Sequence, residues 1–225
     1  MNRLPIRRTE GFSLVELMIA LAVGMIVIAG VVAFTVSTVG SVGRNIGATR
    51  VMQELRGAMS VMTREIKRSG YDRDAIDGIA LGAFPSGYAA LTINPAGDCL
   101  LMSYDRVGVN DANDAPGAGE WKGFRRNVVD GRGILQINTV ANPPSCTTDA
   151  GWIDLTSPQD VSVTDFRLTQ TDLAPIPAGA TAAGPIFVAL REVQIQMRAS
   201  LVSDAATQRG LNERVRVRTD IVTFP

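Results

Sequence analysis

Histidine is absent from this 225-residue sequence, and cysteine occurs only twice. Without histidine, the chain cannot form a Ser-His-Asp or Cys-His catalytic group or a histidine-ligated zinc site. It also has no excess of charge, because 22 basic residues balance 22 acidic ones. Non-specific binding to nucleic acid needs an excess of Lys and Arg, so this balance argues against it. The Ser, Asp and Glu residues form no nucleophilic or acid–base group, and we expect neither an enzyme nor a cofactor.

One stretch near the N-terminus lacks charge altogether. Leu17 to Val36 contains no charged side chain. At about 1.5 Å per residue it spans roughly 30 Å, the thickness of a bilayer core. The residues before it hold Arg3, Arg7 and Arg8 against Glu10, and a positive flank stays in the cytoplasm. We therefore expect a single membrane span, with the N-terminus in the cytoplasm and the rest of the chain outside it.

The residues that lead into this stretch form a motif with fixed offsets. A short basic leader precedes Gly11 and Phe12, three apolar or small residues follow, and Glu16 then precedes the apolar run. A carboxylate at the head of a membrane segment costs on the order of a few kcal/mol if it is unpaired, so such a residue is usually functional. The segment GFSLVELMIAL resembles the class III prepilin signature of type IV pilins and type II secretion pseudopilins.

This resemblance implies that prepilin peptidase cuts between Gly11 and Phe12 and N-methylates Phe12. It also implies that Glu16 neutralises the N-terminal amine of a neighbouring subunit in a filament. Two alternatives stay open. A secretory signal peptide would be cut after the apolar run, although STVGSVGRN offers no good A-x-A site there. The alternative for Glu16 is a first-turn acid that the helix dipole favours by a few tenths to about 1 kcal/mol.

Residues 12 to about 69 are predicted to form one helix of roughly 85 Å. Its second half is amphipathic, with apolar residues at i, i+3, i+4 and i+7. These apolar positions are Ile46, Val51, Met52, Leu55, Met59, Met62 and Ile66. We expect this face to pack on a sheet, and a methionine-rich binding groove is the alternative. Gly40, Gly43 and Gly47 indicate a flexible joint, while Gly70 after a basic last turn indicates the helix end.

From Tyr71 onward the apolar period changes to two, which is typical of antiparallel strands with one wet face. We expect strands at 90–94, 100–104, 123–128, 134–138, 152–155, 161–169, 186–201 and 213–224. A slip of the apolar phase predicts a bulge near Thr164 and Asp165. Residues 71–89 contain no clear element, and 108–120 and 171–185 are predicted loops.

The predicted fold class is therefore α+β, with a long N-terminal helix packed through its second half on an antiparallel β-sheet. The resemblance and the patterns together divide the chain into four parts. We expect a leader at 1–11, a transmembrane or filament-core helix at 12–39, an amphipathic helix at 40–70, and a periplasmic or extracellular β-rich head domain at 71–225.

The two cysteines, Cys99 and Cys146, both lie in the part expected outside the cytoplasm, where oxidising conditions favour their pairing. A bridge across this ~47-residue interval restricts the unfolded chain by roughly 4 kcal/mol in the chain-entropy model, which is disputed. Two separate buried thiols are the alternative.

Two further clusters contain residue types that occur in ligand sites. Oxygen ligands for calcium are available from Asp105, Asn110, Asp111, Asn113 and Asp114. They lack the ordered spacing of a calcium loop, so a solvated turn is the preferred interpretation and no metal site is expected. A basic stripe that could meet DNA phosphates is formed by Arg214, Arg216 and Arg218. Cross-strand pairing or a solvated face is preferred there, because Glu192, Glu213 and Asp220 lie nearby.

The soluble part has a resemblance of its own. Segments 60–71 (SVMTREIKRSGY), 99–111 (CLLMSYDRVGVND) and 213–221 (ERVRVRTDI) are similar to the helix end, the middle strand and the terminal strand of PilW-type minor pilins. This implies a minor pilin that joins a priming complex in pilus assembly, first in the inner membrane and then on the pilus at the cell surface. The implied partners are prepilin peptidase, other minor pilins, the major pilin, the inner-membrane assembly platform and membrane lipid.

Two other kinds of protein stay open. One is a J-type pseudopilin of a type II secretion system. The other is a single-pass envelope protein with a binding or enzymatic ectodomain, for which neither processing at Gly11 nor dependence on Glu16 is expected.

Overall fold

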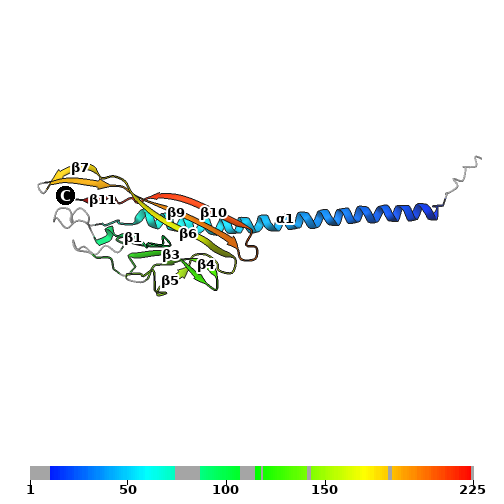
Figure 1. Ribbon diagram of the computed structural model, residues 1–225, viewed down its shortest axis with the longest axis horizontal. Coiled ribbons are helices and arrows are strands. Elements are labelled where there is room, and N and C mark those ends of the chain that lie inside the picture. Colours follow the sequence, from blue (N-terminus) through cyan, green and yellow to red (C-terminus); the bar gives the residue numbers. More distant parts are fainter. Residues whose placement is uncertain are drawn as a thin grey trace, which may run out of the picture. The chain divides into compact units, whose positions relative to one another are not determined.

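The structure is a computed structural model that describes residues 11–73, 87–106, 115–117, 119–140, 143–181 and 184–223. The chain divides into two compact units, Met1–Ile46 and Gly47–Pro225. One helix, α1 (Leu14–Arg68), supplies the first unit from Leu14 and continues into the second (Figure 1). This confirms the predicted long helix. Gly70 lies just after its end with a φ of 76°, the left-handed conformation that glycine adopts most easily.

The second unit contains three antiparallel sheets among its described residues. The first has the order β1–β2–β3–β4–β5, and the short 3₁₀ helix η1 (Gly87–Ala89) precedes it. Its strands are β1 (Leu91–Ile93), β2 (Cys99–Ser103), β3 (Trp121–Val129), β4 (Arg132–Asn138) and β5 (Trp152–Asp154). The second sheet, β10–β9–β6, consists of β6 (Val161–Asp172), β9 (Arg191–Leu201) and β10 (Gln208–Arg216). The third, β11–β8–β7, consists of β7 (Ile176–Thr181), β8 (Gly184–Ala189) and β11 (Ile221–Thr223).

Two predicted strands are wrong in extent, because each of them is two strands. The run 186–201 is divided at Leu190 between β8 and β9, and the run 213–224 is divided between β10 and β11. Both breaks fall where the chain passes between the second sheet and the third. The Val217 amide donates to the Arg191 carbonyl at 2.9 Å and so ties the two crossings together. Apolar alternation continues across a break of this kind, so it could not reveal the change of sheet.

The predicted loop 171–185 is also wrong, since it contains β7. Its Pro, Gly and Ala residues are typical of turns, yet the segment pairs with β8 through an irregularity between Pro177 and Gly179. The predicted bulge in β6 is confirmed by a register shift between Val163 and Asp165. Most of 108–120 and of 71–89 lies outside the described residues.

The core forms where the second half of α1 meets the first two sheets. The predicted apolar face of the helix is buried at Val51, Leu55, Met59, Met62 and Ile66. From the sheets, it meets Leu100, Met102, Phe124, Leu135, Ile137, Val161, Val163, Phe166, Leu168, Val193, Ile195, Met197, Ala199, Val215 and Val217. The methionine stripe is therefore a packed face. Ile46, predicted on the same face, is instead 65% exposed, because it precedes the part of the helix that packs.

Gly47 marks the place where this packing begins, and it is more than a flexible joint. A Cβ atom there would overlap the end of the Leu201 side chain, so a larger residue at this position requires that side chain to move. At Gly40, Gly43 and Gly57 a Cβ would meet nothing within 4 Å. One turn further on, Arg50 reaches Asp160 with 3.1 Å between Nη1 and Oδ1.

The Cys99–Cys146 disulfide, favoured by the sequence, is present with 6.0 Å between its Cα atoms. It joins β2 to the segment between β4 and β5. Arg125, opposite Cys99 on β3, holds the same segment. Its guanidinium donates to the Thr148 carbonyl at 2.8 Å, and it lies 4.5 Å from the centre of the Trp152 ring.

The C-terminal end of α1 in the head is surrounded by buried charged and polar groups. The Tyr104 hydroxyl donates to a Glu65 carboxylate oxygen at 2.6 Å, and the Arg68 guanidinium lies 4.6 Å from the Tyr104 ring centre. Burial, this hydrogen bond and the charge of Glu65 raise the pKa of Tyr104 to about 12. Burial also lowers the pKa of Lys122, whose ammonium donates to the Gly119 carbonyl at 2.8 Å. The contacts of Tyr104 with Glu65 and Arg68 join the helix to the residue that follows β2.

The packing at Gly47 leads to a first prediction. Gly47→Val should destabilise the head by about 1–3 kcal/mol, because overpacking of a closed contact costs that much. Gly57→Val is the matched control, because its side chain enters open space on the same helix. Unfolding of the full chain in detergent, followed by the fluorescence of Trp121 and Trp152, measures the difference. Equal unfolding midpoints for the two variants would contradict the close approach of Leu201.

The raised pKa of Tyr104 leads to a second prediction. A raised pKa in the folded state means that the protonated hydroxyl contributes stability below pH 10 and that this contribution is lost as the pH rises from about 10 to about 12. Denaturant unfolding at a series of pH values should show this loss in the wild type and not in Tyr104→Phe. Lys122 also titrates in alkali, but it is common to both proteins. Parallel pH profiles would show that Tyr104 does not carry the effect.

Candidate functional site

The candidate processing and assembly residues lie at the start of α1. Gly11 and Phe12 precede the helix, and the Leu17 amide donates to the Ser13 carbonyl at 3.1 Å in its first turn. Ser13 and Glu16 have the spacing of a capping box, in which a serine before the helix is followed three residues later by an acid. Gly11, Phe12 and Glu16 are all exposed, and Phe12 is 82% exposed. The structure thus presents the cleavage motif and the carboxylate on accessible chain.

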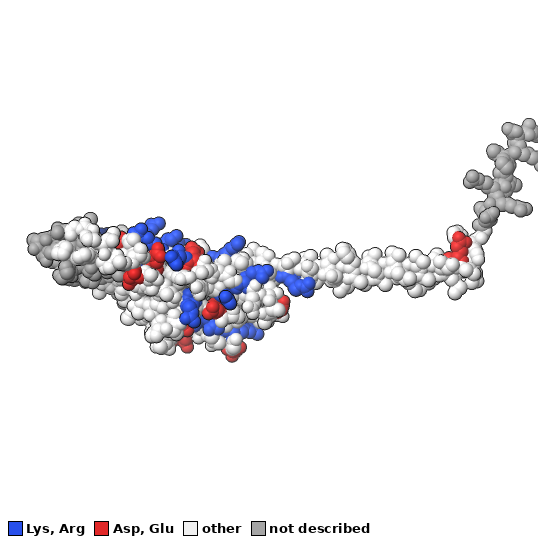
Figure 2. All heavy atoms as spheres, turned by 45° about the horizontal axis from the view of Figure 1, so that its top comes forward, with Lys and Arg blue, Asp and Glu red and all other residues white. Residues whose placement is uncertain are grey.

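The rest of this first unit is a bare apolar helix. From Leu17 to Gly43 it carries no charged side chain, and Figure 2 shows the long uncharged surface that results. Large apolar residues are exposed all round the helix, among them Ile26 and Phe34 at 72% and 74%. The helix is long and apolar enough to cross a membrane, and none of its most apolar stretch is buried within the chain. A surface of this size must be covered by lipid or by other apolar protein.

Of the residues that could supply oxygen ligands for calcium, the structure describes only Asp105. Asp105 is buried and accepts a hydrogen bond from the Arg73 amide at 3.1 Å, while the other residues proposed as calcium ligands lie outside the described ranges. No group of three or more His, Cys, Asp or Glu side chains that could hold a metal occurs in the described part of the chain.

The basic stripe on β10 is largely paired. Arg214 lies 3.7 Å from Glu192 on the neighbouring strand, and Arg216 lies 3.3 Å from Asp220. The Arg214–Glu192 contact agrees with the preferred interpretation, cross-strand pairing, whereas Arg216 contacts a residue four positions further along the chain.

Several buried charges that the sequence did not single out hold the helix end and the sheets together. Arg191 is 3% exposed, and its guanidinium donates to the Ala89 carbonyl at 2.8 Å and lies next to Gly70. Glu120 is buried and accepts hydrogen bonds from the Tyr88 hydroxyl and from the Arg106 and Gly117 amides. Isolated charges in alternating segments give no signal for these roles, because Arg191 bonds to a backbone carbonyl distant in sequence and Glu120 bonds to the distant Tyr88 hydroxyl.

Comparison with known protein families agrees with the geometry at both ends of the chain. Residues 6–32 match the prokaryotic N-terminal methylation motif, which contains Gly11, Phe12 and Glu16 and the first part of α1. Residues 44–217, from the end of the apolar segment to the last turn of the head, match the family described as prepilin peptidase-dependent protein B. No curated protein and no solved structure matches the chain.

The two matches therefore agree with a pilin-like architecture: a prepilin-type motif, an apolar helix, and a head of antiparallel sheets built on the end of that helix. The match to the second family extends over well more than half of the sequence. This chain belongs to the prepilin peptidase-dependent protein B family.

Proposed function

We propose that this protein is a minor pilin of a type IV pilus that takes part in starting pilus assembly. The observation that carries the proposal is the position of the methylation motif, which stands directly before a helix whose apolar surface the chain itself leaves uncovered. The membership of the head in a family described as dependent on prepilin peptidase supports it. The function is one of assembly and not of catalysis.

In this proposal, prepilin peptidase removes residues 1–11 and methylates the new N-terminus at Phe12. An α-amino group has a reference pKa of about 7.7–8.0 and is largely protonated at neutral pH. Methylation keeps that charge. Residues 12–39 then anchor the protein in the inner membrane, with residues 40–225 on the periplasmic side, until the same helix enters the filament.

Glu16 has a defined part in this step. A carboxylate and an ammonium group are each costly in apolar surroundings, and pairing offsets that cost. The exposed Glu16 of one subunit would pair with the Phe12 amine of the next and so fix the axial register between two apolar helices. The partners are other minor pilins and the major pilin, delivered by the inner-membrane assembly platform.

A J-type pseudopilin of a type II secretion system is the second candidate. The two matches do not separate these candidates, because one description names N-terminal methylation, the other names dependence on prepilin peptidase, and neither names a pilus or a secretion system. Deleting the gene distinguishes them: loss of surface pili with normal secretion supports the minor pilin, and the reverse supports the pseudopilin.

Processing gives a third prediction. Gly11→Ala should abolish cleavage, so that the protein keeps the mass of the full chain, whereas the wild type begins at N-methyl-Phe12. Gly24→Ala, a glycine with open space around it further along the helix, is the control. Intact mass and N-terminal sequencing of protein from its own membranes measure the outcome. A wild-type chain that still starts at Met1, or one cut after the apolar run, would overturn the pilin proposal.

Glu16 gives a fourth prediction. Glu16→Gln should leave the protein processed and present in the membrane but lower the amount of surface pili at least tenfold. A role limited to the helix dipole is worth about 1 kcal/mol or less and predicts no such loss. Glu54→Gln, further along the same helix, is the control. The amount of pilin sheared from cells reports assembly, and a normal amount in Glu16→Gln would rule out the pairing.

A further inference from the structure

β10 is an open edge of the sheet that packs on α1. In the sheet order β10–β9–β6, β10 is hydrogen-bonded only to β9 among the strands that the structure describes. The opposite edge meets the first sheet, because Arg126 Nε donates to the Val163 carbonyl at 2.7 Å and the Gly133 amide donates to Ser162 Oγ at 3.2 Å. An open edge offers unpaired backbone groups to another strand.

A hollow of about 360 Å³ lies on the sheet face at this edge. It is present because Gly210, on β10, has no side chain beside Arg198, its partner on β9. A Cβ at Gly210 would lie 3.2 Å from the Met197 carbonyl oxygen and 3.3 Å from Arg198 Cγ. The φ of Gly210 is not in the left-handed region, so the backbone does not demand glycine there. The absence of a side chain at Gly210 leaves room for the hollow.

The walls of the hollow are polar. Gln196, Arg198, Asn212 and Asp165 contribute to them. Asp165 lies opposite Arg198 in the strand register, yet within the described chain no ion pair of 4.0 Å or less joins the two. Arg214 and Arg216 on the same face do have such partners. Arg198 is thus an exposed cation at the hollow that has no ion pair with a described residue, and a carboxylate from outside can reach it.

The face of β10 that points toward the core favours apolar side chains in a partner strand. Leu211 is only partly buried there and packs against the core cluster. A strand added to β10 would place apolar side chains beside Leu211 and polar ones over Gly210, since side chains alternate between faces. Strand addition takes its affinity from main-chain hydrogen bonds and its specificity from pockets for alternate side chains.

We propose that β10 binds an extended segment of another pilin-like subunit, and that a carboxylate side chain of this segment enters the hollow over Gly210 and pairs with Arg198. Only the nature of the partner, another subunit, rests on the proposed function; the chemistry of the segment rests on the hollow and the edge. The segment alternates apolar and polar residues and carries Asp or Glu at a central polar position.

The test measures binding of three labelled peptides to the full chain in detergent, by fluorescence anisotropy. The first is a nine-residue peptide of alternating Thr and Val with Glu at its centre. The second replaces that Glu by Gln, and the third replaces two Val by Pro to prevent main-chain pairing. We expect the Glu peptide to bind at least tenfold more tightly than the Gln peptide, and the Pro peptide not to bind.

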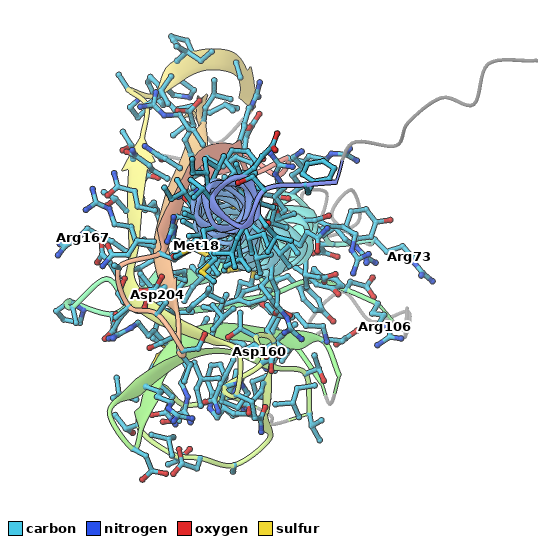
Figure 3. All side chains as sticks on the ribbon, turned by 90° about the vertical axis from the view of Figure 1, so that its right-hand side faces the viewer. Met18, Arg73, Arg106, Asp160, Arg167 and Asp204 are labelled. Atoms are coloured by element: carbon cyan, nitrogen blue, oxygen red, sulfur yellow. A yellow bond between two sulfur atoms is a disulfide. The ribbon has the colours of Figure 1, made fainter. Side chains whose placement is uncertain are left out.

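Three variants of the protein locate the site. Arg198→Gln should remove the preference for Glu over Gln while binding of the Gln peptide persists. Gly210→Val should fill the hollow and weaken the Glu peptide at least tenfold. Arg167→Gln is the matched control, because Arg167 is an exposed arginine of β6 and projects from the same sheet, away from α1 (Figure 3). Unchanged unfolding midpoints show that each variant is folded.

Three results would overturn the proposal. They are equal binding of the Glu and Gln peptides to the wild type, binding of the Pro peptide, or an equal loss of binding in Arg167→Gln. N-terminal sequencing of the same preparation separates this inference from the proposed function. Peptide binding by a chain not cut at Gly11 would leave the edge site standing while the pilin proposal fails.

Discussion

The uncovered apolar surface of the first part of α1 is the constraint on which the rest of this protein depends. Residues Leu14 to Ile46 form a helix that the chain does not bury, so lipid or other subunits must cover it. A folded head alone cannot satisfy that surface. In the proposed function, this helix serves first as a membrane anchor and then as part of a filament, and both surroundings are apolar.

The C-terminal end of α1 is fixed by contacts within the head. From Gly47 the helix is buried by apolar packing, and the contacts at its end are polar. Glu65 bonds to Tyr104, and Arg191 reaches a carbonyl of η1 beside the glycine that ends the helix. A buried charge is costly unless it forms hydrogen bonds, and these bonds largely offset that cost. The contacts therefore restrict the position of the helix end more than they add to the stability of the head.

The first and second sheets differ in how their edges are covered. The first sheet is tied down by the disulfide and by Arg125, and one edge of the second sheet is covered by the first. The other edge, β10, pairs with no second strand among the described residues, and it carries the charged residues Arg209, Glu213, Arg214 and Arg216. Charged side chains on an edge strand oppose non-specific pairing with the edge strands of other molecules. In the proposed interaction, the hollow at Gly210 admits one specific partner strand. Assembly through surfaces fits a family described by its processing rather than by a reaction.

The sequence by itself determined the processing motif, the long helix, its buried face from Val51 to Ile66, most strands and the bulge in β6. These features depend on local spacing and on the period of apolar residues, which are read directly along a chain. Only the tertiary structure decided that two predicted strands each belong to two sheets, that a Pro- and Gly-rich segment is β7, and that Gly47 is a packing position. It alone revealed the roles of Arg191, whose partners are distant backbone atoms, and of Glu120, whose partners include the distant Tyr88 hydroxyl. Such contacts depend on how elements far apart in sequence meet, and no local pattern records that.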